Sequence, residues 1–198
     1  MKETLIISIL ILFIYTFLTL NKNNLVLMES SDLGTKFLVH NDKLKQASAN
    51  LIGEVISRMY KLKNHLVNIK SKFSNSNDKW IKDSINLLEK NFNEERTKIY
   101  ENSPKSEYTS YSVNKGEEVV FCLKSKKNGQ LHKINLMMYV AIHEMSHIGC
   151  HEIGHTQLFK DIFEFYTREA IKINIYQYED YDSNPVEYCG MVLSSSII

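Results

Sequence analysis

The stretch HEMSHIGCHEIGH (His143–His155) contains the pattern His-Glu-x-x-His twice, as HEMSH and again eight residues later as HEIGH. On a helix, residues four apart lie on the same face, about 6 Å apart along the axis. Two imidazoles at this spacing can bind one zinc ion. The glutamate after the first histidine then lies beside the metal, where it can take a proton from water that zinc activates. The motif therefore requires a helix.

The two copies of the motif differ in their expected secondary structure. Seven helix-compatible, largely apolar residues (136–142) lead into HEMSH and predict a buried helix. HEIGH follows Gly149 and contains Gly154. Glycine inside a helix costs about 1 kcal/mol relative to alanine, and it permits the positive φ angles that end helices. We expect Gly149 to cap the helix and the second copy to lie mostly in a turn.

A turn at Gly149 also supplies a third ligand. If one helix ran through both copies, His143 and His155 would lie about 18 Å apart along its axis. If the chain turns back instead, His155 reaches the metal at the start of the next helix. The sequence thus predicts a Zn²⁺ site formed by His143, His147 and His155, with Glu144 as the base. An open fourth position for water is typical of catalytic zinc sites.

Other residues are alternatives to His155 as the third ligand. His151 would bind on a tighter loop, and a downstream carboxylate such as Glu164 or Glu169 is a further possibility. Glu152, in the second copy, is expected to lie on the surface or beside the ligands. Cys150 is able to bind zinc, but it is expected to pack instead.

The composition is that of an ordinary globular protein. The chain has 198 residues, of which 43% are hydrophobic and 24% charged, with a net charge of +1. This balance does not indicate a nucleic-acid partner. Cys122, Cys150 and Cys189 are too few and too scattered for a disulfide framework. They favour a reducing compartment, although one disulfide remains possible.

The N-terminus carries an apolar segment, TLIISILILFIYTFLTL (Thr4–Leu20), of 17 residues without a charge. This length is the lower limit for a membrane-spanning helix. No A-x-A-like cleavage site follows, so an uncleaved anchor over residues 1–20 is favoured over a signal peptide or a buried helix. Single charges on both sides leave its orientation undetermined. The chain is therefore expected to be a single-pass membrane protein.

A polar linker is expected over residues 21–40, followed by one α+β domain over residues 41–198. The domain divides into a helical part (41–93) and a part with a hairpin and the zinc site (107–198). Apolar residues at steps of three and four predict helices over 41–70, 79–92 and 156–173. Thr156 is a suitable N-cap for the last helix.

Two stretches rich in β-branched and aromatic residues predict a hairpin, Tyr108–Val113 and Glu118–Lys124. Asn114 and Gly116 suit the turn between them. The second strand is a candidate for pairing with an extended substrate. A further strand is expected near residues 187–193.

Three other histidines and one tyrosine are expected to have structural roles. His40, His65 and His132 have no motif around them, so they are expected to lie on the surface or to be hydrogen-bonded in the core. Tyr188 is able to stabilise an oxyanion, but a tyrosine in such a C-terminal segment more often packs.

The segment from Glu118 to Tyr166 resembles the WLM and SprT-like zinc metallopeptidases. These share a hairpin, a helix with His-Glu-x-x-His, a turn, and a third histidine before a helix that opens with an aromatic residue, here Phe159. The resemblance implies a zincin-like α+β domain with the same three histidine ligands and the same glutamate base. The seven residues between the second and third histidines exceed the usual WLM spacing.

The segments YTSYSVNKG, GHT and NPVEYCGM, with the upstream ASANLIGEVISRMYKLKNHL, resemble uncharacterised membrane-anchored proteins of large DNA viruses. WLM and SprT-like proteins act on proteins crosslinked to DNA. That substrate is not carried over, because this chain is near neutral and predicted to be membrane-anchored.

The sequence thus predicts a viral, membrane-anchored zinc metallopeptidase that acts on a protein or peptide substrate. The alternatives are a catalytically inactive, zinc-stabilised interaction module and a metal-free membrane scaffold.

Overall fold

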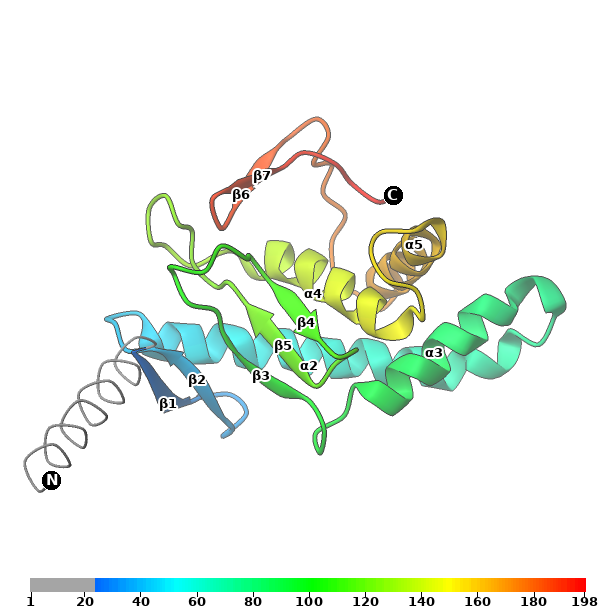
Figure 1. Cartoon of the computed structure of the whole chain (residues 1–198), viewed down its shortest axis with the longest axis horizontal. Coiled ribbons are helices and arrows are strands. Elements are labelled where there is room, and N and C mark those ends of the chain that lie inside the picture. The colour runs from blue at the N-terminus through cyan, green and yellow to red at the C-terminus, as the bar shows by residue number, and fades with distance from the viewer. Residues whose placement is uncertain (1–23) are drawn as a thin grey trace, which may run out of the picture.

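The computed structural model describes residues 24–198 and has the predicted α+β architecture (Figure 1). A five-stranded mixed sheet has the strand order β1-β2-β3-β5-β4, and β6 and β7 form a separate hairpin. The strands are β1 (Leu25–Glu29), β2 (Lys36–His40), β3 (Lys98–Glu101), β4 (Tyr111–Val113), β5 (Glu118–Phe121), β6 (Val186–Tyr188) and β7 (Met191–Leu193). The helices are α2 (Lys45–Ile69), α3 (Lys79–Asn91), α4 (Ile134–Gly149) and α5 (Gln157–Lys172).

The predicted linker over residues 21–40 is wrong for residues 25–40, which form the antiparallel hairpin of β1 and β2. In β2, Phe37 and Val39 are buried, whereas Lys36 and Leu38 are exposed. This alternation is typical of a strand with one covered face. It spans only five residues among polar neighbours, which hides it in the sequence.

Helix α4 lies at the centre of the helical layer and packs against α2, α3 and α5. Helix α2 packs against the β1–β2 hairpin, and in Figure 1 it runs behind the sheet. Twelve of the sixteen residues of α4 are buried, which agrees with the apolar run before HEMSH. The first copy of the motif therefore stands on a helix that the core holds on several sides.

The predicted hairpin of two strands is present as β4 and β5, which pair antiparallel. Asn114, Lys115 and Gly116 in its turn all have positive φ angles. Strand β5 lies between β3 and β4, so both of its edges are already paired. The expectation that this strand pairs with a substrate is therefore wrong, and β4 is the free edge at this end of the sheet.

Helix α4 ends at Gly149, as predicted, but the reason differs from the one expected. Gly149 does not have a positive φ angle, so it does not end the helix as a left-handed cap. A Cβ atom on Gly149 would lie 2.5 Å from the Tyr166 hydroxyl and 3.1 Å from the carbonyl oxygen of Ser84. Glycine is required here because α3 and α5 approach the end of α4 closely.

The close approach predicts that Gly149→Ala destabilises the fold by about 1–3 kcal/mol, the usual cost of overpacking a tight site. This cost exceeds the benefit of about 1 kcal/mol that alanine brings to a helix. Urea unfolding of the two proteins measures the difference. Adding Tyr166→Phe, which removes the nearest atom, should recover part of the loss. A double variant no more stable than Gly149→Ala alone would contradict this explanation.

The hairpin of β6 and β7 is set apart from the main sheet, above α4 in Figure 1. A disulfide joins Cys122, just after β5, to Cys189 in the hairpin turn. It links the hairpin covalently to the main sheet. The backbone N–H of Cys189 also donates to His132 Nε2 (3.3 Å). The expectation of reduced cysteines is thus corrected for this pair, while Cys150 is a free, buried thiol.

Within residues 24–198, no helix is both long and apolar enough to cross a membrane. The anchor predicted over residues 1–20 lies outside the described residues.

Candidate metal centre

Three histidine side chains converge at one point in the described structure. The Nε2 atoms of His143 and His147 are 3.2 Å apart, and each lies 3.1–3.2 Å from Nε2 of His155. Nitrogens bound to a tetrahedral zinc ion at about 2.05 Å lie about 3.3 Å from one another. The triangle of nitrogen atoms therefore fits the size of a zinc ion.

The sequence around the cluster explains how the third histidine reaches the other two. His143 and His147 lie four residues apart on α4, on one face of the helix. Residues 151–155, the second copy of the motif, contain no helix or strand, and Gly154 has a φ of +83°. Thr156 then caps α5 by accepting a hydrogen bond from Phe159 N–H (3.3 Å). The chain thus turns back and places His155 directly before α5.

Phe159 forms one wall of the cluster. Its ring stacks on that of His147, with the ring centres 4.2 Å apart, and its centre lies 4.8 Å from that of His155. This is the aromatic residue that opens the helix after the third histidine.

Burial keeps the histidines of α4 uncharged. Burial, together with the neighbouring His147 and His155, lowers the pKa of His143 to about 3. Burial, together with the neighbouring His155 and the positive charge of Lys115, lowers the pKa of His147 to about 4. Neutral imidazole is the form that binds metal ions. Both side chains are therefore in the binding form at neutral pH.

Glu144 lies next to the cluster on α4 and is 4% exposed. Burial raises the pKa of its carboxyl group to about 7, and a hydrogen bond from the Ser112 side chain on β4 partly opposes this rise. A carboxylate with a pKa near the working pH is suited to accept and return a proton.

The raised pKa predicts that Glu144→Gln stabilises the metal-free protein at high pH. The pKa of Glu144 is higher in the folded chain than in the unfolded chain. Below about pH 4 the carboxyl group is protonated in both states, so its charge does not lower the free energy of unfolding. As the pH rises, burial of the charged carboxylate lowers the free energy of unfolding. The loss reaches its full value of about 3 kcal/mol above the folded pKa. Urea unfolding at pH 4.5 and pH 8 should show that the variant gains stability mainly at pH 8. An equal gain at both values would contradict the prediction.

His151 lies away from the cluster. Its side chain is 68% exposed, and its Nε2 lies 3.9 Å from Oε1 of Glu152. Cys150 is buried, and burial raises the pKa of its thiol. Neither residue belongs to the group of ligand atoms formed by the three histidines.

The two downstream carboxylates also face other partners. Glu164 pairs with Arg168 on the surface of α5. Glu169 is buried, and its carboxylate accepts hydrogen bonds from His65 on α2 (2.7 Å) and Lys172 (2.5 Å). The bond from His65 joins α2 to α5, and the two bonds together leave Glu169 no role at the cluster.

The other histidines have hydrogen-bond partners, as predicted. His40 Nε2 lies 2.8 Å from the carbonyl oxygen of Asn102, and His65 binds Glu169. His132 groups with Cys122 and Cys189, but these cysteine sulfurs are joined in the disulfide. In the described residues, the three-histidine cluster is therefore the group with free ligand atoms.

A cleft of about 780 Å³ opens over the cluster, between β4, α4 and the β6–β7 hairpin. Its other lining residues are largely apolar or aromatic and include Tyr111, Tyr139, Val140, Ile153, Tyr188, Met191 and Leu193. Burial raises the pKa of Tyr188, whose hydroxyl lies 2.5 Å from Ser110 Oγ. Tyr188 thus packs in the wall of the cleft with a protonated hydroxyl.

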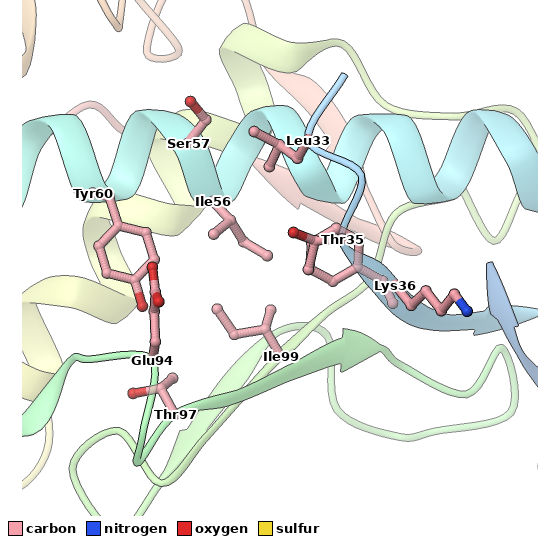
Figure 2. A pocket seen from close by; sticks show the side chains of 10 residues that line it. Leu33, Thr35, Lys36, Ile56, Ser57, Tyr60, Glu94, Thr97 and Ile99 are labelled. Carbon is pink, nitrogen blue, oxygen red and sulfur yellow. The ribbon is translucent and has the colours of Figure 1, made fainter. Parts of the chain in front are cut away.

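A second cleft of about 450 Å³ lies between α2 and the strands β2 and β3. Figure 2 shows Ile56 of α2 and Ile99 of β3 pointing toward each other across it, and Tyr60 and Glu94 also line it. Its lining contains no histidine or cysteine. It therefore lacks the ligand set of the first cleft.

Comparison with known proteins gives one relative that covers most of the chain and another that covers a third of it. No family model matches it. The uncharacterized protein R325 of Acanthamoeba polyphaga mimivirus is 39% identical over 169 residues, which cover 85% of this chain and 82% of that protein. The chain belongs to the family of R325. The uncharacterized protein 136R of Invertebrate iridescent virus 6 is 35% identical over 69 residues, or 34% of this chain and 38% of that protein. The predicted resemblance to proteins of large DNA viruses is thereby confirmed.

Among solved structures, the R325-family chain is similar to Wss1 from Saccharomyces cerevisiae, with 17% identity and a TM-score of 0.38. The match covers 49% of this chain and 75% of that one. This likeness is too low to support a conclusion about function. The assignment to the zincins and the ligand roles of the histidines therefore stay predictions.

Proposed function

We propose that this member of the R325 family is a zinc-dependent metallopeptidase. One observation carries the proposal: the Nε2 atoms of His143, His147 and His155 converge within 3.2 Å of one another, in the same cleft as the buried Glu144. Three histidines that leave one position open, with a carboxylate alongside, are the protein's share of a hydrolytic zinc site.

Each residue has a defined part in the proposed reaction. The three histidines would hold Zn²⁺, which supplies a Lewis acid that polarises the scissile carbonyl and makes water more acidic. Glu144 accepts the proton from the attacking water and delivers it to the leaving amine. The Ser112 side chain on β4 opposes part of the rise in the pKa of Glu144. The apolar walls keep bulk water from the carboxylate and maintain its raised pKa.

The proposed substrate is an extended peptide with apolar side chains. Strand β4 is one of the two edge strands of the sheet and lines the cleft, so its backbone is placed to pair with an extended chain. Glu144 and Lys115 are the charged residues in the cleft lining, apart from the histidines. Ile153, at the rim, is 90% exposed. These features favour an uncharged segment over an acidic or basic one.

We also propose that residues 1–20 anchor the protein in a membrane as a single span, on the basis of their 17-residue apolar run. Extraction of the full chain from membranes with alkaline carbonate, beside a chain without these residues, tests the anchor.

The experiment for the proposed activity uses the purified full chain in detergent. Bound zinc is measured by atomic emission, and hydrolysis is followed with quenched fluorescent peptides that carry apolar, acidic or basic centres. We expect about one zinc per chain, and cleavage of the apolar peptide that a chelator stops and added zinc restores. Bound zinc without hydrolysis would support the inactive interaction module instead. A chain without zinc would support the metal-free scaffold.

A further inference from the structure

Lys115, in the turn between β4 and β5, joins this turn to the segment that carries His155. Its ammonium group donates hydrogen bonds to three backbone carbonyl oxygens: His147 (3.3 Å), Cys150 (2.7 Å) and Glu152 (2.6 Å). An ammonium group has three protons, so this set uses all of them. The first carbonyl belongs to the last turn of α4, and the other two belong to the segment 150–155.

We propose that Lys115 is a positioning residue that fixes the segment 150–155 and thereby holds His155 against His143 and His147. The inference rests on the proposed zinc site. The last carbonyls of a helix have no partner within the helix, and they attract a positive charge. Lys115 gives the carbonyl oxygen of His147, at the end of α4, both a hydrogen-bond donor and a positive charge.

Cys150, at the start of the segment, is buried, but residues 151–155 have little else to hold them. In the described part of the chain, no backbone–backbone hydrogen bond outside the helices involves residues 150–155. His151 and Ile153 are exposed, and Gly154 has nothing within 4 Å of its Cβ position. A loop with few contacts opens readily, so its order depends on the bonds from Lys115.

The turn that carries Lys115 is held firmly. A Cβ atom on Gly116 would lie 2.9 Å from the carbonyl oxygen of Asn91, at the end of α3, and 3.2 Å from Ile148 of α4. The turn is therefore wedged between two helices. It provides a fixed base from which the lysine side chain reaches the segment.

The backbone at Lys115 also argues for a role of the side chain. Its φ is +55°, a region that lysine rarely adopts and that glycine and asparagine tolerate better. The turn alone would thus favour a glycine at this position. The three hydrogen bonds of the ammonium group explain why a lysine occupies it.

Zinc affinity of full-chain variants tests the inference, measured by competition with a chromophoric chelator. Lys115→Met keeps the length of the side chain without its charge, and Lys115→Gly also relieves the backbone. Both should weaken zinc binding about 10- to 100-fold, as the loss of groups that orient ligands does. Lys115→Arg should recover part of the affinity, because a planar guanidinium keeps the charge but not the same three bonds. The exposed Lys105→Met is the matched control and should bind like the wild type.

Two further measurements separate positioning from a general effect on stability. The visible absorption of the Co²⁺-loaded protein, which reports ligand geometry, should change in Lys115→Gly, whereas unfolding of its metal-free form should not show a loss of stability. If Lys115→Met does not fold, Lys115→Gly still decides the question. Wild-type affinity and an unchanged Co²⁺ spectrum in Lys115→Gly would overturn the inference alone. A wild-type chain that binds no zinc would overturn the proposed function, and this inference with it.

Discussion

Glu144→Gln is expected to lower peptide hydrolysis by about 10²- to 10⁴-fold, the usual contribution of a general acid–base residue, while zinc stays bound. Glutamine has nearly the same shape as glutamate, but it cannot accept and return the proton. The three histidines are not altered, so metal affinity should hold. The measurements are kcat/KM with the apolar peptide and the zinc content of the same preparation.

The sequence offers a matched control for this variant in its second motif. Glu152 has the same place in HEIGH as Glu144 has in HEMSH, but its side chain is 40% exposed. Glu152→Gln should therefore keep wild-type turnover. Wild-type turnover in Glu144→Gln would refute the proposed mechanism. Equal losses of turnover in the two variants would contradict the assignment of the base to the first motif alone.

His155→Ala should weaken zinc binding by more than about 100-fold, because the loss of a group that only orients a ligand already costs 10- to 100-fold. His151→Ala should bind zinc like the wild type. The structure motivates the contrast: His155 Nε2 lies 3.1 Å from His143 Nε2, whereas the His151 side chain is 68% exposed and outside the cluster.

Chelator competition on the two alanine variants gives both affinities under one set of conditions. His155→Ala should also lose hydrolysis in proportion to its loss of zinc at a limiting metal concentration. If His151→Ala loses zinc and His155→Ala does not, the third ligand is His151 and the loop has a different conformation in the loaded protein.

The parts of the site that depend on local spacing could be predicted from the sequence. His143 and His147 share a face because helical geometry relates residues four apart, and the apolar run before them indicates a buried helix. Thr156 was recognisable as an N-cap because its side chain meets the backbone three residues on. The second copy of the motif lies in a turn, as its Gly154 predicted, and this residue has a φ of +83°.

The parts that depend on distant contacts could not be predicted. Gly149 is required by Tyr166 and Ser84, which lie on two other helices. Lys115 contacts carbonyls 32 to 37 residues away, and no local pattern marks it as different from other lysines. Strand β3 pairs in parallel with β2 and β5. It has only four residues, and these contain no sequence pattern that would predict a strand or its partners.

The disulfide between Cys122 and Cys189 closes a covalent ring that contains the three histidines and Glu144, with α4, the segment 150–155 and α5 inside it. With the proposed activity, the protein would be exposed to its own cleavage, and the rim residue Ile153, which is 90% exposed, is the kind of site where a folded chain is nicked. A nick there would fall within the ring. The two fragments would stay joined through the sulfur bridge, each keeping its histidines next to the other's, and they would separate only after reduction.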